Sequence, residues 1–308
     1  MLCTKCTAST LLFPKMPFMP RQRGRLFRIF IKTGKRMMAN KNSYKKSSFG
    51  PAFLFLEKAR RTALADYYEF CRLMDDIADE PDVKNPEKEL SFWKEEVSRM
   101  YEGTPVTDLG RRLQKDVRSF GMLPDRFLLL IEGMQADLAG RTYQTEQELE
   151  WYLLRVAVIV GRATLDILGV QGQQADQLSW ELGRAVQITN IIRDVADDKK
   201  LGRVYLPAEL LAKYGLTREA VLQEEMPPKL AGVLRELSAR AEKHYQKAFS
   251  LMGLFPRLKM LPCKVMGYVY LKNLAKIRKE GFLVSVPVKL TKGEKLQSVF
   301  YALFKTIF

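Results

Sequence analysis

The sequence predicts an all-α protein with one main domain, and three features of the chain support this. After about residue 46, apolar residues recur at spacings of three and four nearly throughout, which is the period of an amphipathic helix. Alternating runs typical of strands are almost absent, with residues 284–288 as the one short exception. The breaks are short and rich in Gly or Pro, so one helical domain with short connections follows.

Examples of the predicted helical segments are 52–78, 87–101, 106–120, 126–139, 146–168, 175–196, 228–252 and 264–279. The chain has 308 residues, 47% of them hydrophobic, which is enough for a sizeable buried core. No internal repeat or low-complexity linker interrupts it.

Charge divides the chain into two parts. The net charge is +16, but residues 1–46 contain twelve Lys/Arg and no Asp or Glu, whereas the remaining residues carry 39 Lys/Arg against 35 Asp/Glu. We therefore predict a basic N-terminal leader, residues 1–46, and a domain, residues 47–308. Such an arm is typical of nucleic-acid or membrane-surface contact. The body has no recognisable nucleic-acid motif, so no nucleic-acid partner is expected.

The leader has two explanations that the residues leave open. Residues 23–38 place Leu, Phe and Ile among Arg and Lys, which suits a peripheral contact with an anionic membrane. Alternatively, translation starts at Met37 or Met38 and the upstream residues come from an over-extended reading frame.

The sequence lacks the features that several classes of protein require. The four cysteines are too few and too scattered for a disulfide framework, and no run of about 20 apolar residues could span a membrane. We therefore expect a cytoplasmic protein, with peripheral contact on the inner face of the membrane as an option. The sole histidine, His244, is expected to face solvent, which argues against a catalytic triad. No glycine-rich nucleotide motif is present, so no NADPH is expected.

The chemistry of the chain lies in two acidic helix faces. Residues three and four apart share a helix face. The first face comprises Tyr68, Arg72, Asp75, Asp76 and Asp79. Carboxylates at i and i+4 repel each other on a bare helix, and a cation between them would reverse that repulsion.

The second face follows the same spacing more than a hundred residues later. It comprises Gln187, Asn190, Asp194 and Asp198, with Arg193 at its edge. Hard oxygen ligands without His or Cys suit Mg²⁺, with Mn²⁺ as the alternative ion. A cluster of such ions together with arginines can neutralise a departing diphosphate, leaving an allylic cation in an apolar pocket. One such helix is usually a solvated face; two, each embedded in an apolar helix, favour a metal–phosphate site.

At these residues the sequence resembles the squalene/phytoene synthase family, over roughly residues 47–300. The first acidic face resembles the family's first aspartate-rich motif, and the second face, continued by Gly202 to Pro207, resembles the second motif. Lesser matches are Ser47-Ser48-Phe49, Gly133-Met134 with Asp137, Tyr152 with Arg155-Val156, and Val160-Gly161. The resemblance implies a single-domain helical isoprenoid synthase fold with a central cavity between the two aspartate-rich helices.

The resemblance also implies roles for individual residues. Two or three Mg²⁺ ions would be held by Asp75, Asp79, Asn190, Asp194 and Asp198. The substrate diphosphates would be bound by Arg72, Arg193, Arg203 and Ser48. Tyr68 and Gln187 would line the reacting centre, and the catalytic group would comprise Tyr68, Arg72, Gln187 and Asn190. A structural loop contact is the alternative for Arg203, and Asp137 is an open case, in or out of the site.

The expected reaction is the head-to-head condensation of two prenyl diphosphates. Residues 270–296 look most like the members that make presqualene diphosphate from two farnesyl diphosphates on the squalene and hopanoid route. Phytoene synthesis from two geranylgeranyl diphosphates, on the carotenoid route, is the alternative, and dehydrosqualene synthesis is third. Downstream pathway enzymes are further candidate partners. A non-catalytic relative acting in assembly or binding is the alternative from another class, but all four metal carboxylates are present.

Overall fold

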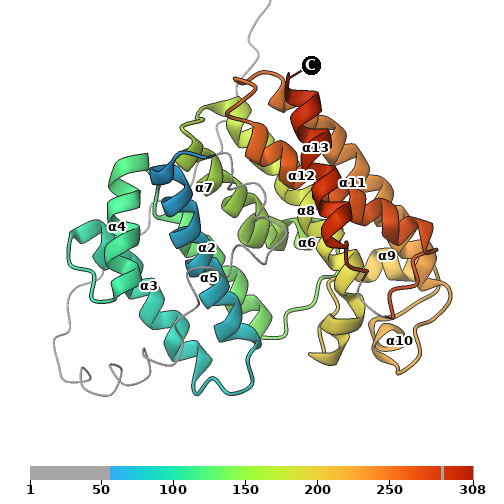
Figure 1. The fold of residues 1–308 in the computed structure, drawn as a ribbon. Helices are drawn as coiled ribbons and strands as arrows, with labels where there is room; N and C mark the ends of the chain where they lie inside the picture. The colour runs from blue at the N-terminus through green and yellow to red at the C-terminus, as the bar shows by residue number, and fades with distance from the viewer. Residues whose placement is uncertain (1–55, 286–287, 308) are drawn as a thin grey trace, which may run out of the picture. The chain divides into compact units, whose positions relative to one another are not determined.

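The computed structural model describes residues 56–285 and 288–307, which form helices joined by short turns (Figure 1). Three predicted features lie outside the described residues: the leader (residues 1–46), Ser48, and the N-terminal end of the first predicted helix (residues 52–55). The helices, labelled as in Figure 1, are α2 Lys58–Asp79, α3 Pro86–Glu102, α4 Asp108–Phe120, α5 Asp125–Leu138, α6 Glu146–Leu153, η3 Leu154–Val158, α7 Ile159–Leu168, α8 Gln173–Lys200, α9 Ala208–Lys213, α10 Arg218–Leu222, α11 Leu230–Met252, α12 Leu261–Lys279 and α13 Lys292–Ile307. No strand is assigned in this part of the chain.

Helix α8 is the central element of the described chain. It packs against η3, α7, α11 and α12, and its apolar residues Ile188, Ile191, Ile192 and Val195 are buried in the main core cluster. Gly183 permits the contact with η3, because a Cβ there would lie 2.7 Å from the Cα of Val158. This close approach fixes the part of α8 that carries the second acidic face.

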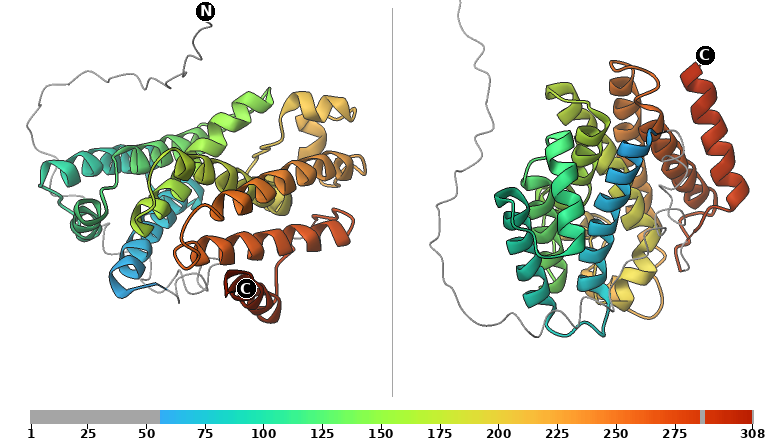
Figure 2. Two further views of the ribbon diagram at one scale, coloured as in Figure 1. Left: turned by 90° about the horizontal axis from the view of Figure 1, so that it is seen from above. Right: turned by 60° about the vertical axis from the view of Figure 1, so that its left-hand side comes forward.

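Helix α2 is held by a second group of helices, α3, α4, α5 and α7 (Figure 2). Its buried residues include Phe70, Met74 and Ile77, which recur at the spacing of one helix face. Arg112 of α4 ties it further, with its Nε 2.8 Å from Asp66 Oδ1 and an Nη 2.6 Å from Glu69 Oε2. The first acidic face is therefore on a helix that is anchored on its opposite side.

In the described residues a helix lies at each predicted range, the first beginning only at Lys58, with three further differences. The segment 146–168 is one run interrupted by five residues of π-helix, η3, a feature often found near functional sites. The short helices α9 and α10 and the C-terminal helix α13 were not predicted. The strand-like run at 284–288 is not a strand in its described residues: Val284 and Val288 are buried in the core, and the Val288 carbonyl accepts a hydrogen bond from the Asn273 side chain at 2.7 Å. Its alternation reflects a linker lying on the core.

The prediction that His244 faces solvent was wrong. Its side chain is only 16% exposed, and Nδ1 lies 2.5 Å from Glu181 Oε2. The reason is that α11 packs along α8, which brings the polar residue of one helix against that of the other. The histidine has a partner in the packing between helices and is not part of the acidic faces.

Candidate active site

The first acidic face carries its own arginine. Arg72 Nη1 lies 2.8 Å from Asp75 Oδ2, and Nη2 lies 2.6 Å from Asp76 Oδ1. These contacts follow from spacings of three and four on α2. Because the Arg72 side chain is about half exposed, it can move toward a ligand at little cost.

The last carboxylate of this face is bound by an arginine from elsewhere in the chain. Arg203 donates to Asp79 Oδ1 and, at 3.0 Å, to the Ala78 carbonyl oxygen. Arg203 follows α8, and Gly202 precedes it with φ +72°, a left-handed conformation that favours glycine after a helix end. This turn directs the arginine from the C-terminal end of α8 to the C-terminal end of α2.

The second acidic face is more deeply set. Arg193 Nε and Nη2 lie 2.7 and 2.5 Å from the two oxygens of Asp194, a bidentate pair in which both side chains are mostly buried. One turn earlier, the Asn190 amide nitrogen donates to Gln187 Oε1 at 3.1 Å. Asn190 Oδ1 is buried and has no hydrogen-bond partner among the described residues, so it is an oxygen available to a ligand.

The carboxylates of the two faces influence one another. Desolvation, followed by the negative charge of Asp79, raises the pKa of Asp75 to about 7, although Arg72 opposes the rise. Desolvation and then Asp194 raise the pKa of Asp198 to about 8, with further contributions from Asp137 and Asp79. Negative charges from both helices therefore converge on one region, where a cation would be strongly favoured.

Asp137 of α5 lies in this region too, and both its oxygens are occupied. The hydroxyls of Tyr152 and Tyr205 donate to Oδ2 and Oδ1 at 2.9 and 2.8 Å. Burial raises the pKa of Asp137 to about 6, and the tyrosine hydrogen bonds and Arg203 limit the rise. The two tyrosine rings stack at a centroid distance of 4.9 Å. Asp137 thus fixes the loop after α8 that carries Arg203 and Tyr205.

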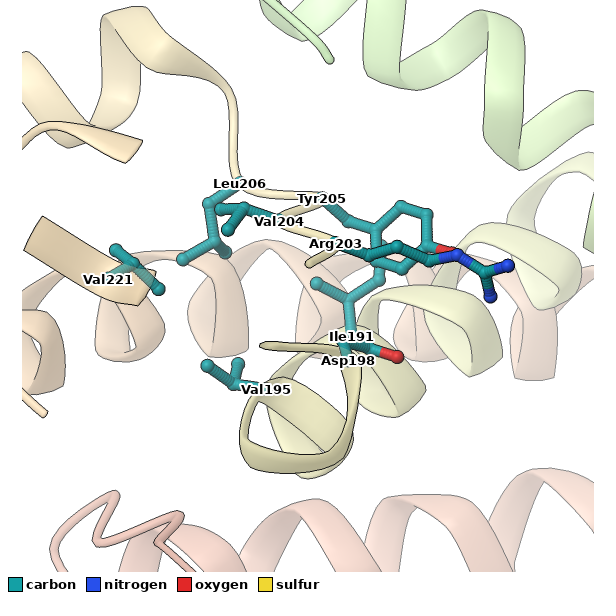
Figure 3. A pocket seen from close by; sticks show the side chains of 8 residues that line it. All are labelled: Ile191, Val195, Asp198, Arg203, Val204, Tyr205, Leu206 and Val221. Carbon is teal, nitrogen blue, oxygen red and sulfur yellow. The ribbon is translucent and has the colours of Figure 1, made fainter. Parts of the chain in front are cut away.

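Figure 3 shows the small pocket beside the second face. The polar ends of Asp198, Arg203 and Tyr205 point to one side, and Val195 and Val221 lie on the other. The pocket has a volume of about 10 Å³, room for about one water. This small pocket borders the second acidic face. The larger cavity expected to hold the prenyl chains stays a prediction.

A third helix, α12, contributes a tyrosine that the sequence analysis did not assign to the site. Tyr270 of α12 is buried, which raises its pKa; the nearby Arg193 cation opposes this, and Asp194 and Tyr68 add to it. Tyr68, Arg193 and Tyr270 are therefore neighbours, although they come from α2, α8 and α12. No local pattern in the sequence marks Tyr270, because its neighbours on α12 are those of an ordinary core helix.

The donor set fits a hard divalent ion. It consists of carboxylate oxygens and the Asn190 amide oxygen, which suit Mg²⁺ or Mn²⁺. Within residues 56–285 and 288–307, no three acidic, His or Cys side chains are close enough together to hold an ion by themselves. Mg²⁺ generally keeps several waters and is bound by one or two carboxylates together with substrate phosphates.

Most of the predicted site residues thus lie near one another. The structure groups Arg72, Asp75 and Asp79 of α2 with Asp194, Asp198 and the loop residue Arg203. The same face of α8 also carries Gln187, Asn190 and Arg193. Tyr68 and Arg193 both lie close to Tyr270. Ser48 lies outside the described residues. The sequence analysis left Asp137 open, in or out of the site, and did not assign Tyr270 to it.

The described chain is thus an all-α protein in which two aspartate-rich helices and a set of arginines converge on one region. The sequence profile described as squalene/phytoene synthase matches residues 44–294, and the chain belongs to this family. No helix in the described part of the chain is long and apolar enough to cross a membrane.

The relatives agree with this assignment. A presqualene diphosphate synthase of Rhodopseudomonas palustris is 36% identical over 253 residues, covering 81% of this chain and 90% of that protein. A presqualene diphosphate synthase of Zymomonas mobilis is 33% identical, covering 84% and 88%. A phytoene synthase of Thermus thermophilus is also 33% identical, but covers only 66% and 68%.

Solved structures give the same fold. A dehydrosqualene synthase matches with a TM-score of 0.78 and 25% identity, covering 90% of this chain and 98% of that one. A squalene synthase from Alicyclobacillus acidocaldarius matches with a TM-score of 0.73 and 27% identity, covering 82% and 94%. The predicted fold class and family are confirmed.

Proposed function

We propose that this chain is a prenyltransferase that joins two farnesyl diphosphates head to head and releases presqualene diphosphate. The observation that supports this most is the convergence of two Asp-x-x-x-Asp faces and their arginines in a member of this family. The product is favoured because relatives named presqualene diphosphate synthase match over more of the chain than those named phytoene synthase. Condensation of two geranylgeranyl diphosphates to phytoene is the second candidate.

The reaction balances as two farnesyl diphosphates giving one presqualene diphosphate, one free diphosphate and one proton. The leaving diphosphate departs with the electron pair of the C–O bond, so its negative charge must be stabilised. In this proposal Arg72, Arg193 and Arg203 bind the phosphate oxygens. Each is now held by a carboxylate of the same site, and a diphosphate would compete for it.

In this proposal the carboxylates of the two acidic faces would act as metal ligands. Asp75, Asp79, Asp194, Asp198 and the Asn190 oxygen would hold Mg²⁺, in two or three ions. When bound, Mg²⁺ supplies neutralisation of the developing charge on the leaving group. Prenyl diphosphate synthases generally use a divalent metal, and the number of ions here is part of the proposal.

The side chains around the allylic carbocation must stabilise its positive charge without forming a covalent bond with it. Tyr68 and Tyr270 offer aromatic faces near the arginines, and cation–π support suits an allylic cation. Gln187 is engaged with Asn190, which orients both amides on one face of α8. We assign Tyr68 and Gln187 to the wall of the reacting centre.

The test uses the purified full chain with Mg²⁺ and farnesyl diphosphate, without NADPH, and mass spectrometry of the products. Presqualene diphosphate is the expected product, also when NADPH is added. Incubation with geranylgeranyl diphosphate is the parallel arm. Release of phytoene at a much higher kcat/KM would move the assignment to the second candidate, and no condensation with either substrate would refute both.

We also propose that the basic leader contacts an anionic membrane, and its two explanations lead to different results. If the leader is a membrane-surface arm, a chain that begins at Met38 keeps its activity in detergent and binds phosphatidylglycerol vesicles more weakly. Equal vesicle binding by both chains would rule out the arm. An N-terminal peptide beginning at residue 37 or 38 in the native protein would show that the leader is not made.

A further inference from the structure

The C-terminal helix α13 has one face buried and one face apolar but exposed. It packs on α12, and its buried residues are Ser298, Val299, Ala302 and Thr306. Along its other side, at helical spacings of four, four and three, large apolar side chains are each more than half exposed: Leu296, Phe300, Phe304 and Ile307. A contiguous apolar face of this kind on a helix marks an interaction surface.

The neighbouring turn adds exposed apolar residues at one end of this face. Figures 1 and 2 show α12 and α13 side by side, with the turn between α11 and α12 at the same end as the C-terminus. Leu254 and Leu258 of this turn are exposed, and so are Arg257 and Lys259 beside them. Apolar and basic side chains are therefore adjacent in this turn.

This part of the chain is strongly basic. Residues 254–308 contain eleven Lys/Arg and only two Asp/Glu. One of the two, Glu294, is already paired with Lys276 at 3.2 Å. Lys279, Lys289, Lys292 and Lys305 are all exposed. Outside the leader, the positive charge of the molecule is thus concentrated around α12 and α13.

We propose that the outer face of α13 docks on an anionic lipid bilayer, with the helix axis in the plane of the membrane. Phe300 and its neighbours would enter the boundary between head groups and acyl chains, and the lysines would meet the anionic lipids. A second copy of the chain fits the exposed face of α13 less well than an anionic bilayer does. A twofold contact through this face would bring two strongly basic surfaces together, and their repulsion opposes it.

This surface contains none of the residues of the two acidic faces and none of the leader. It consists of folded, described residues, and most of α13 lies beyond the part of the chain that matches the family profile. Its occupation would keep an enzyme of lipid substrates at the membrane.

A local reporter tests it in the full chain. The Phe300→Trp variant is mixed with vesicles of phosphatidylcholine containing 30% phosphatidylglycerol, with and without brominated acyl chains. We expect a blue-shifted emission that the brominated lipid quenches, after subtraction of the signal of the wild-type protein. Leu123→Trp is the control, because Leu123 has the same 54% exposure as Leu296 but lies between α4 and α5; it should not be quenched.

Binding measurements provide a second readout. In vesicle sedimentation, Leu296→Glu should weaken binding by at least tenfold, and Leu123→Glu by no more than twofold. Vesicle binding without quenching at position 300 would assign the contact to the leader and overturn the proposal. A dimer in sedimentation velocity that Leu296→Glu dissociates would overturn it in favour of a second copy. Absence of vesicle binding by the wild-type chain would also refute it.

Discussion

The two acidic faces differ in where their arginines come from and in how deeply they lie. On α8, Arg193 binds both oxygens of the adjacent Asp194, and the two side chains are only 22% and 28% exposed. On α2, Arg72 is about half exposed, and Asp79 relies on Arg203, which the loop after α8 supplies. The acidic face on α8 is therefore positioned by its own helix and by the core. The acidic face on α2 also needs Arg203, which comes from the loop after α8.

Under the proposed function, this difference gives the two helices distinct tasks. Paired and mostly buried side chains lose little freedom when a ligand arrives, so α8 provides a pre-organised half of the site. The exposed Arg72 can change its partner more easily, which suits its proposed exchange of a carboxylate for a phosphate. Arg203 couples the halves, because it touches α2 while Asp137 and its tyrosines hold its loop.

The largest effect is expected from the pre-organised half. Asp194→Asn removes a proposed metal ligand and should lower kcat/KM by at least a thousandfold, about 4 kcal/mol of transition-state stabilisation. Asp197→Asn is the matched control: it changes the same residue type three positions on, half exposed and paired with Lys200. That variant should stay within about twofold of wild type in a steady-state assay titrated with Mg²⁺. Near-normal turnover by Asp194→Asn would break the site assignment.

A smaller effect is expected when the coupling between the halves is cut. Arg203→Gln removes the contact with Asp79 and a proposed phosphate ligand, so kcat should fall about a hundredfold, about 2.7 kcal/mol. Arg111→Gln is the control, since Arg111 forms an exposed pair with Asp108 on α4. The two variants are compared in the same assay, with thermal unfolding to show that both are folded. If the two arginine variants behave alike, Arg203 has only a structural role in its loop.

The smallest effect is expected on the stability of the metal-free protein and its pH dependence. The folded-state pKa of Asp198, raised to about 8, lies above that of the unfolded chain, so the folded state binds the proton more tightly. Stability should therefore decline as pH rises from about 4 through about 8. Asp198→Asn, which cannot ionise, should raise stability at pH 8 in EDTA by about 1 kcal/mol and the Tm by a few degrees.

The control for this prediction is pH itself. At pH 5 the wild-type Asp198 is largely protonated, so the advantage of the Asn variant should shrink; thermal unfolding at both pH values measures it. An equal gain at pH 5 and pH 8 would mean that the carboxyl is not the titrating group.

The sequence by itself determined the fold class, the family and the two acidic faces. Helical periodicity is written into residues three and four apart, so Asp75 with Asp79 and Asp194 with Asp198 can be assigned to a face without knowing what lies opposite. The same local reasoning placed Gln187 and Asn190 on one side of α8, where they form a hydrogen bond.

The tertiary structure decided which groups meet across the chain. Arg203 and Asp79 are 124 residues apart, and their contact depends on the packing of α8 and on the turn at Gly202. The two tyrosines on Asp137 and the approach of Tyr270 to Arg193 depend in the same way on packing between helices. Charges shift one another's pKa only when they are close in space, and that closeness is a property of the packed helices that no short pattern in the sequence contains.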